Sequence, residues 1–427
     1  MDILVIGGGG REHAIAWALS KSEQVEQLYC APGNGGIGEI AQCVDVKATD
    51  IPGMVAWAKE NQMDFVMVAP DDPLAMGMVD AMEAAGIPAF GPHANAAVIE
   101  ASKAFSKSLM KKYHIPTAKY ETFDDPAKVM AYIRAEGKYP VVIKADGLAL
   151  GKGVLICQNE QEAADGVKEI MLDKKFGASG NHVVVEEFLT GPEVSVLSFC
   201  DGKTVKPMVS SMDHKRALDH DEGLNTGGMG TVAPNPYYTP AVAERCMQEI
   251  FLPTVAAMQA EGCPFKGCLY FGLMLTPDGP KVIEYNCRFG DPETQVVLPL
   301  LESDLLTVME ATTNGTLDKT DVKFSDGAAA CVILASGGYP LAYEKGKEIT
   351  GLTAGQLDAA DVTVYHAGTA IKDGSLVTNG GRVLGVTATA NTLPEALKKA
   401  YAATESIHFD KLHKRSDIGA RALAAMQ

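Results

Sequence analysis

The sequence has no pair of cysteines in a C-x-x-C arrangement. Its nine cysteines are scattered, and the nearest two, Cys263 and Cys268, have four residues between them. An odd count without framework spacing argues against structural zinc and favours reduced thiols, as in the cytoplasm. The sequence also lacks a basic leader and any apolar run of membrane-spanning length. We therefore expect a cytoplasmic protein without membrane contact.

Basic residues are few relative to acidic ones. The chain has 37 Lys and Arg against 54 Asp and Glu, a formal net charge of −17. This balance opposes nonspecific attraction to nucleic acid or anionic lipid. We therefore expect no nucleic-acid partner, and any phosphate site has to be built from local groups. No obligate protein partner is evident from the sequence.

Several signature motifs are missing. No H-R-D or D-F-G sequence exists, which argues against a protein kinase, and no Met-Lys-Met sequence is present for biotin attachment. What the chain does have is ordinary globular composition, with 47% hydrophobic and 21% charged residues over 427 positions. That length predicts two to four domains, at roughly 100 to 200 residues each.

Strand and helix patterns alternate over the first hundred residues. Strands are expected at 3–6, 27–31, 64–70 and 87–92, and helices at 11–20 and 74–85. This alternation predicts a doubly wound parallel sheet with sites at the carboxyl ends of its strands. We divide the chain into an α/β domain (1–100), a linker helix region (101–116), a small α+β unit (117–189), a large mixed region (190–326) and a C-terminal α+β domain (327–427).

The N-terminal glycines, "GGGGREHA", do not complete a dinucleotide fingerprint. The third glycine of G-x-G-x-x-G should stand at Glu12 or His13, and the second strand ends without a ribose-binding acid. A turn at Gly9 and Gly10 feeding a helix beside Arg11 suits a single phosphate instead. The alternative is that these glycines serve only tight packing.

The stretch "VVIKADGLALGKGVLIC" resembles a P-loop only superficially. Three residues, not four, separate Gly147 from Gly151, and Gly153 stands where Ser or Thr should be. Its apolar flanks predict a hairpin, in which Lys144 and Lys152 could fold over a triphosphate. A plain surface hairpin is the alternative.

Two further strands end in polar residues. In "HVVVEEFLTGPEVSV", backbone and apolar groups at Glu186, Glu187, Phe188 and Leu189 could hold an adenine, and the carboxylate of Glu193 the ribose. In "PKVIEYNCRFGDPET", Glu284 and Asn286 share one face of a strand and are hard ligands suited to Mg²⁺, with Arg288 next in the row if the strand persists. The alternatives are solvated acids and an exposed polar strand face.

The segment "SSMDHKRALDHDEGLNTGGMG" combines cations with an acid ahead of a glycine loop. Asp213, Lys215 and Arg216 could bind a phosphate or carboxylate together with an amine. A histidine metal site is the rival, but His214 and His220 have no third His or Cys nearby.

In order along the chain, these motifs resemble the glycinamide ribonucleotide synthetase family of the ATP-grasp superfamily. The collinear series is "GREHA", "APGN", "SKAFSK", "IKADGLALGKGV", "VEEFL", "DHKR", "NTGGMG", "IEYNCRFGDPETQ", "ASGGYP", "HAGT" and "TNGGRVL". The resemblance implies ATP-grasp small and large subdomains between the N- and C-terminal domains. It also implies that ATP and Mg²⁺ or Mn²⁺ convert glycine to glycyl phosphate, which 5-phosphoribosylamine then attacks.

The resemblance also assigns roles to residues. Lys103 and Lys144 should contact ATP phosphates, with the hairpin from Gly151 to Gly153 as a mobile cover. Arg288 and the Asp213 segment should surround glycine and the transferred phosphoryl group. The glycine loop should do so too; it comprises Asn225, Thr226, Gly227, Gly228 and Met229. The phosphoribosylamine site should comprise Gly9, Gly10, Arg11, Asn34 and Asp71.

Two departures from the family pattern stand out. The family usually shows Gly-Pro-Glu where this chain has Ala69-Pro70-Asp71, and the strand "CLYFGLML" carries no metal-binding acid. Two other functions remain open on the residues: an ATP-grasp carboxylase acting on biotin or an imidazole ribonucleotide, and a nucleotide-binding regulator without turnover.

Overall fold

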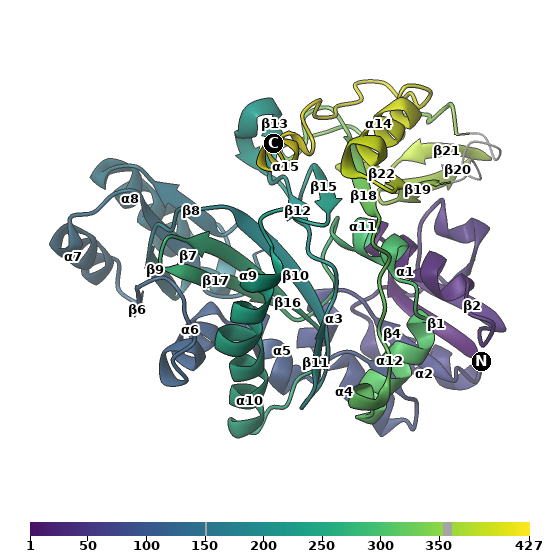
Figure 1. The fold of residues 1–427 in the computed structure, drawn as a ribbon, viewed down its shortest axis with the longest axis horizontal. Helices are drawn as coiled ribbons and strands as arrows, with labels where there is room; N and C mark the ends of the chain where they lie inside the picture. Colours follow the sequence, from purple (N-terminus) through teal and green to yellow (C-terminus); the bar gives the residue numbers. More distant parts are fainter. Residues whose placement is uncertain (150–151, 353–360) are drawn as a thin grey trace.

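The computed structural model describes residues 1–149, 152–352 and 361–427. Figure 1 shows the N-terminal sheet at the right, a small subdomain projecting at the left, and the C-terminal part on top. A large antiparallel sheet lies between them. This arrangement confirms the expected multidomain α/β and α+β fold.

The N-terminal sheet is parallel, as predicted. It consists of five strands in the order β3-β2-β1-β4-β5. Their bounds are β1 (Asp2–Gly7), β2 (Gln27–Pro32), β3 (Gln42–Cys43), β4 (Phe65–Val68) and β5 (Ala89–Phe90). Helices α1 (Gly10–Ser20) and α2 (Ile51–Glu60) follow β1 and β3. Because β1 is fully buried between its neighbours, the loop that follows it is held at the carboxyl edge of the sheet.

The helix expected over 74–85 is two helices. Helix α3 spans Asp71–Ala75 and α4 spans Met78–Ala84. Gly77 separates them with φ = +93°, a left-handed conformation that ends a helix. The break places Asp71 at the start of α3, beside the carboxyl end of β4.

Two helices link the N-terminal domain to the next. Helix α5 (Ala94–Ala101) runs directly into α6 (Lys103–Lys112). Ser102 divides them, since its extended backbone ends α5 and its hydroxyl accepts the N–H of Phe105 at 3.1 Å to cap α6. The helix expected in the linker region 101–116 is therefore α6, and α5 was not foreseen.

The small subdomain is a four-stranded antiparallel sheet in the order β6-β9-β7-β8. Its strands are β6 (Tyr120–Phe123), β7 (Val141–Ala145), β8 (Val154–Cys157) and β9 (Val183–Glu187). Helices α7 (Pro126–Glu136) and α8 (Glu160–Val167) pack on its apolar face. The antiparallel pairing of β7 with β8 confirms the predicted hairpin.

The large subdomain is built on the antiparallel sheet β11-β10-β16-β17. Its strands are β10 (Glu193–Asp201), β11 (Val205–Pro207), β16 (Lys266–Thr276) and β17 (Gly279–Asn286). Helices α9 (Pro240–Cys246) and α10 (Leu252–Ala260) flank it, and α12 (Leu305–Asn314) packs against β10 and β16.

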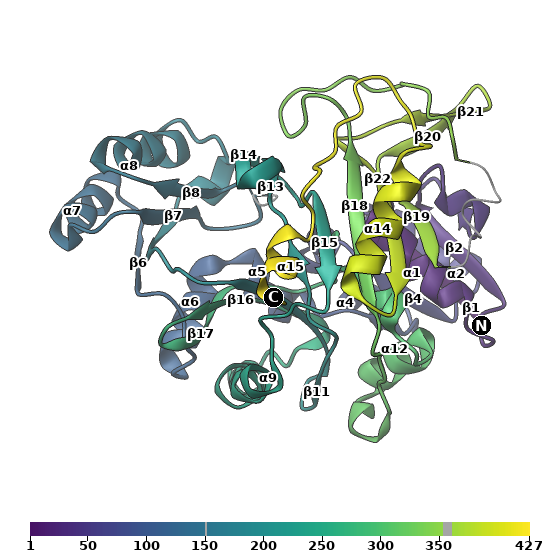
Figure 2. The same cartoon turned by 45° about the horizontal axis from the view of Figure 1, so that its top comes forward.

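The C-terminal sheet takes two strands from the middle of the chain. Its order is β12-β15-β18-β22-β19. The strands are β12 (Met212–Asp213), β15 (Gly230–Ala233), β18 (Ala328–Ala335), β19 (Val362–His366) and β22 (Arg382–Ala390). Helix α14 (Leu393–Thr404) covers one face, visible in Figure 2, and its N-cap is Thr392. The smaller elements are α11 (Thr294–Val297), α15 (Ala420–Ala425) and the hairpins β13 (Arg216–Leu218) with β14 (Glu222–Asn225) and β20 (Thr369–Lys372) with β21 (Ser375–Thr378).

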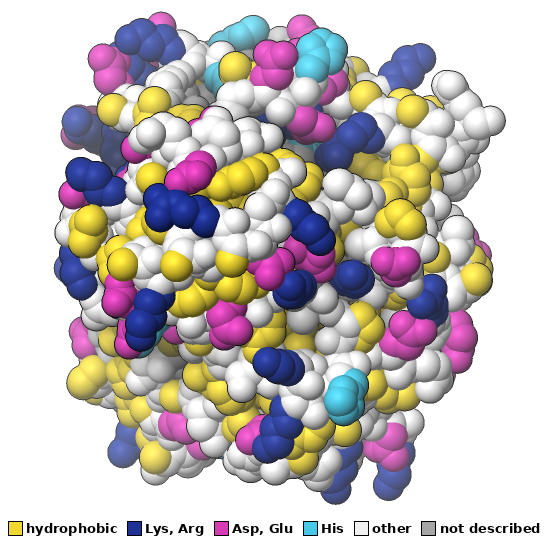
Figure 3. All heavy atoms as spheres, turned by 90° about the vertical axis from the view of Figure 1, so that its left-hand side faces the viewer, with side chains coloured by type: hydrophobic (Ala, Val, Ile, Leu, Met, Phe, Trp, Pro, Cys, Tyr) yellow, Lys and Arg dark blue, Asp and Glu magenta, His cyan; other side chains and the backbone are white. Residues whose placement is uncertain are grey.

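The surface over the small subdomain mixes charges of both signs. Figure 3 shows basic and acidic side chains interspersed on this face, without one large basic patch. Exposed pairs such as Arg134 with Glu160, at 2.6 Å, contribute to the pattern. Among the described residues, no helix is both long and apolar enough to cross a membrane.

Candidate active site

Strand β17 presents Glu284 and Asn286 on one face, as its period of two predicts. They lie opposite Gly272 and Tyr270 of β16. The side-chain amide of Asn286 donates to Glu100 Oε1 at 2.9 Å, which leaves its Oδ1 as the free ligand atom. The strand ends at Asn286, so Arg288 follows it in an irregular segment and does not continue the row.

Glu100, at the end of α5, organises the residues after β17. It is buried, and it accepts the Cys287 N–H at 2.7 Å and pairs with Arg288 at 3.2 Å. Burial alone would lower the pKa of Arg288, but the carboxylates of Glu100 and Asp71 outweigh it and raise the pKa. Arg288 is therefore a fixed cation, held between the linker helices and the N-terminal domain.

The donor set on β17 fits a magnesium ion. Glu284 and Asn286 offer one carboxylate and one amide oxygen, both hard ligands. The described residues contain no group of three or more His, Cys, Asp or Glu arranged to hold a metal. A site with only two protein ligands suits Mg²⁺, which keeps waters and completes its shell with nucleotide phosphates.

Buried lysines converge on Glu186 at the end of β9. Glu186 Oε1 lies 3.1 Å from Lys144 Nζ of β7 and 3.2 Å from Lys107 Nζ of α6. Desolvation lowers the pKa of Lys107 to about 8, against the attraction of Glu186. Lys144 also donates to the Ile283 carbonyl at 3.1 Å, which ties the small subdomain to β17. The side chain of Glu186 is thus a counter-ion for both lysines, and its backbone lies within the sheet opposite Tyr120 and Val142.

Lys103 begins α6 and reaches the hairpin. Its ammonium donates to the Gly147 carbonyl at 2.8 Å. Desolvation lowers its pKa, the nearby Lys144 acts in the same direction, and the carboxylate of Glu284 opposes both. Lys103, Lys144 and Glu284 therefore lie close enough to influence one another's charge; the two lysines are the residues predicted to contact ATP phosphates, and Glu284 the one predicted to hold the metal.

The remaining residues predicted to bind nucleotide line the edge between the two subdomains. Phe188 is exposed, and Glu187 accepts the Lys119 N–H at 2.9 Å. Glu193 begins β10 and is also exposed. On the hairpin Lys152 is exposed and Gly153 buried, whereas Gly151 lies outside the described residues; Leu189 is partly buried.

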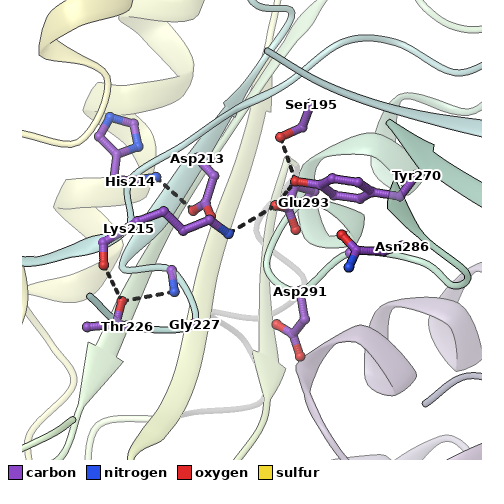
Figure 4. A network of polar contacts seen from close by, with 12 residues as sticks. Ser195, Asp213, His214, Lys215, Thr226, Gly227, Tyr270, Asn286, Asp291 and Glu293 are labelled. Atoms are coloured by element: carbon purple, nitrogen blue, oxygen red, sulfur yellow. Dashed lines mark hydrogen bonds and ion pairs between the residues drawn. The ribbon is translucent and has the colours of Figure 1, made fainter. Parts of the chain in front are cut away.

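A polar network joins three strands at the centre of the molecule (Figure 4). Lys215 Nζ lies 2.5 Å from Asp213 Oδ2 and 3.8 Å from Glu293 Oε1. The Tyr270 hydroxyl contacts Glu293 Oε1 at 3.1 Å and Ser195 Oγ at 2.8 Å. Desolvation raises the pKa of Glu293, and the ammonium of Lys215 opposes this. The network thus places two carboxylates around the ammonium of Lys215.

The glycine loop is folded back onto this network. Thr226 Oγ1 donates to the Lys215 carbonyl at 2.8 Å and accepts the Gly228 N–H at 2.9 Å. A Cβ at Gly228 would lie 2.7 Å from Asp213 Oδ1. The loop spans Asn225 in β14 to Met229, which is buried before β15. By contrast, the guanidinium of Arg216 donates to the Gly223 carbonyl within its own hairpin.

The loop after β1 meets the segment that follows β17. The Gly9 N–H donates to Glu12 at 2.6 Å, and the Arg11 N–H to Asp291 at 3.3 Å. Gly10 lies against Gln295, where a Cβ would approach the Gln295 amide to 2.6 Å. Glu12 therefore fills the turn that would hold a dinucleotide pyrophosphate, in agreement with the incomplete fingerprint.

Asn34 ties its loop to both neighbours. Its amide donates to the carbonyls of Gly8 and His366, at 3.0 and 2.7 Å, and its Oδ1 accepts the N–H groups of Gly36 and Ile37. Asp71 sits at the start of α3 and accepts the Asp72 N–H. The predicted sugar-binding residues thus surround one edge of the parallel sheet.

Sequence reasoning missed the residues that connect these groups. Their pairing carries no local signal, because the partners lie far apart in the chain. Only Lys107 carried a local sequence signal, because it follows Lys103 by four residues and therefore lies on the same helix face. The missed residues are Ser195, Tyr270, Glu100, Lys107, Glu293, Asp291 and Arg382.

Comparison with known families matches almost the whole chain to one family. The phosphoribosylglycinamide synthetase models match residues 1–100 (N domain), 101–294 (ATP-grasp domain) and 329–421 (C domain). The chain belongs to this family. A phosphoribosylamine–glycine ligase from Caldanaerobacter subterraneus is 47% identical to it over 98% of this chain and 100% of the relative. One from Brucella melitensis is 48% identical over 99% of this chain and 98% of the relative.

Solved structures agree. A crystal structure of phosphoribosylamine–glycine ligase from Thermotoga maritima has a TM-score of 0.86 at 34% identity, covering 98% of this chain and 100% of that one. A Hydrogenobacter thermophilus 2-oxoglutarate carboxylase biotin carboxylase domain, solved with MgADP and bicarbonate, has a TM-score of 0.74 at 17% identity, covering 100% and 94%. The second likeness is one of fold alone.

Proposed function

We propose that this protein is a phosphoribosylamine–glycine ligase of purine biosynthesis. It joins glycine to 5-phosphoribosylamine with ATP, giving glycinamide ribonucleotide, ADP and phosphate. The observation that carries the proposal is family membership across all three domains, with relatives of that name matched end to end. The geometry of the site supports the same chemistry.

The nucleotide lies between the small and large subdomains. Lys103 and Lys144 contact the phosphates from the hairpin side, and Lys152 and Gly153 cover them together with Gly151, which lies outside the described residues. The segment from Glu186 to Leu189 holds the adenine and Glu193 the ribose. Glu284 and Asn286 would hold Mg²⁺ or Mn²⁺, which would neutralise phosphate charge.

Glycine and the transferred phosphoryl group occupy the space over the Asp213 network. A glycine carboxylate oxygen attacks the γ-phosphorus, and the bond to ADP breaks. Lys215 and Arg288 stabilise the charge that develops, while Asp213 attracts the ammonium of glycine. Arg216 and the loop from Asn225 to Met229 close this part of the site.

The amine of phosphoribosylamine then attacks the acyl carbon of glycyl phosphate. The carbon–oxygen bond to phosphate breaks, the new carbon–nitrogen bond forms, and the amine gives up a proton. Gly9, Gly10, Arg11, Asn34 and Asp71 seat the sugar phosphate at the edge of the parallel sheet. Excluding water from the closed site protects the acyl phosphate from hydrolysis.

The wider setting follows from the same proposal. The enzyme acts on small molecules in the cytoplasm and needs no protein partner, nucleic acid or membrane. Its overall acidity gives no attraction to polyanions, so phosphates are bound by the local cations of the site.

The decisive experiment measures ADP release in magnesium buffer. We expect release to require glycine together with phosphoribosylamine generated in situ, and glycinamide ribonucleotide to appear by mass spectrometry. Release that depends on bicarbonate instead would indicate a carboxylase. Tight ATP binding without any turnover would indicate a regulator.

The metal assignment is tested by Glu284→Gln. Loss of one of only two protein ligands should reduce kcat by at least about 100-fold, in line with the loss of a main electrostatic contributor. The matched control is Glu249→Gln, which breaks an exposed pair with Arg245 and should leave turnover unchanged. Full turnover by Glu284→Gln would overturn the assignment.

A further inference from the structure

The C-terminal segment lies against the hairpin that follows the Asp213 network. The hydrogen bonds of Arg415 and Ser416 to Arg216 and Asp219 join the last residues of the chain to the β13–β14 hairpin, and Figure 1 shows α15 close to β13. We call residues 413–421 the clasp. It begins where His413 pairs with Ala335 of β18 and ends in the first residues of α15.

Arg415 is the centre of the clasp. Its side chain is only 1% exposed, the largest among the fully buried side chains. It donates to Asp417 at 2.8 Å, to Asp221 at 3.1 Å and to the Arg216 carbonyl at 3.1 Å. A buried guanidinium with partners on two segments fixes their relative position, because its planar fork requires a defined geometry.

Other clasp residues repeat the same connection. The Ser416 N–H donates to Asp219 at 2.8 Å, and the His220 N–H donates to Asp417 at 2.9 Å. His413 contacts the Ala217 carbonyl at 2.7 Å. The clasp therefore contacts the segment from Arg216 to Asp221, immediately after Lys215, at five of its six residues.

His214 extends the connection to the other side of Lys215. It is buried, its Nδ1 lies 3.0 Å from the Gly230 carbonyl, and its Nε2 accepts the Gly419 N–H at 3.1 Å. Because a carbonyl only accepts and an N–H only donates, the ring is neutral with its proton on Nδ1. Desolvation lowers the pKa of His214 to about 4, which agrees with this state.

We propose that Arg415 is a positioning residue for the glycine-binding part of the site, acting through the clasp. Clasp contacts flank Lys215 at His214 and at Arg216, so they set where its ammonium stands relative to Asp213. No hydrogen bond or ion pair of Arg415 reaches Lys103, Lys144 or Glu186, which are assigned to the nucleotide. The guanidinium of Arg421, at the end of the clasp, does act on the carboxylate of Glu193. The inference rests on the proposed ligase function.

The experiment compares Arg415→Met, Arg415→Lys and Lys414→Met in the full-length enzyme. Lys414 adjoins Arg415 but faces Glu405 at 3.0 Å and Thr404 at 2.7 Å, away from the hairpin, so it is the matched control. We expect kcat of Arg415→Met to fall about 10- to 100-fold, the scale of a misplaced reactive group. The KM for glycine should rise, the Kd for ATP should stay unchanged, and Arg415→Lys should restore part of kcat.

A purely structural role would lower the apparent kcat in proportion to the folded fraction and would leave the KM for glycine unchanged, so a raised KM for glycine marks the positioning role. Unchanged kcat in Arg415→Met, or an equal loss of ATP affinity, overturns the proposal. If Arg415→Met does not fold, Asp221→Asn, which keeps side-chain volume, replaces it as the test. A fall in kcat that is smaller than expected for Arg415→Met, with an unchanged Kd for ATP, supports the proposal. An unchanged kcat in Asp221→Asn overturns it. Wild-type turnover in the same assay separates this outcome from failure of the ligase function itself.

Discussion

At the scale of single residues, Gly228 is the tightest point of the Asp213 network. Its φ is +127°, and a Cβ there would lie 2.5 Å from Pro292 Cδ and 2.7 Å from Asp213 Oδ1. Contacts that short cannot be accommodated by rotation of a flexible side chain, because one partner is a proline ring. The loop therefore approaches the carboxylate as closely as it does only because this residue is glycine.

We predict that Gly228→Ala displaces Asp213 from Lys215 and lowers kcat by about 100-fold. The matched control is Gly262→Ala, since Gly262 also has positive φ, at +79°, but no atom lies within 4 Å of its Cβ position. The control should cost only about 1 kcal/mol of backbone strain and leave kcat unchanged. Steady-state kinetics with thermal unfolding checks both; equal kinetics in the two variants would contradict the close-approach argument.

The candidate site was predictable only where its residues share a local pattern. Glu284 and Asn286 could be found because they are two positions apart on one strand. Glu100 and Glu293 could not, since their partners are chosen by the packing of distant elements: Glu100 bonds Asn286 across 186 positions. Sequence spacing contains the period of a strand but not the neighbour that a buried carboxylate will meet.

At the scale of elements, the sequence was enough to predict the hairpin of β7 and β8 but not the break between α3 and α4. The hairpin of β7 and β8 was predictable because apolar β-branched runs flank a glycine-rich turn. The break at Gly77 was not, because an isolated glycine inside a helical pattern is compatible with a continuous helix. Tertiary contacts of α3 with α5 decide that case.

Helix α6 gives an element-scale prediction, because it carries both Lys103 and Lys107. Its cap Ser102 also contacts Asp146 after β7, at 3.2 Å. Ser102→Ala should cost about 1 kcal/mol and raise the KM for ATP severalfold by loosening the first turn. Thr392→Ala, which removes the cap of α14, is the matched control with a similar stability cost. An unchanged KM for ATP in Ser102→Ala would show that the cap does not position Lys103.

At the scale of the whole molecule, one apolar core runs through three domains. It includes Ile3 and Ile15 of the N-terminal domain, Phe199 of β10, and Cys331 and Ile333 of β18. The sequence predicted the separate domains but not that β12 and β15 join the C-terminal sheet, since β15 and β18 are nearly a hundred positions apart. Pairing at that separation depends on the assembled core and leaves no local pattern.

A pair of buried histidines lies where the N- and C-terminal domains meet. The backbone N–H of His366 donates to His13 Nδ1 at 2.7 Å, so this nitrogen has no proton. The rings are 5.5 Å apart, and Tyr365 packs edge-on against His13. Desolvation, followed by the neighbouring His366, lowers the pKa of His13 to about 3, and desolvation lowers that of His366 to about 4.

These depressed pKa values predict acid destabilisation of the domain junction. Between the folded value and about 6.5 the unfolded chain binds protons that the folded protein does not, so stability falls as the pH is lowered. From pH 7.5 to 5.5 the loss should be about 1.3 kcal/mol for each histidine. His13→Gln keeps an acceptor for the His366 N–H but cannot titrate. In urea unfolding, the free energy that the two histidines together lose between pH 7.5 and 5.5 should therefore be about halved in this variant. His408→Gln, at an exposed position, is the control and should behave as wild type; the full wild-type pH loss in His13→Gln would refute the assignment.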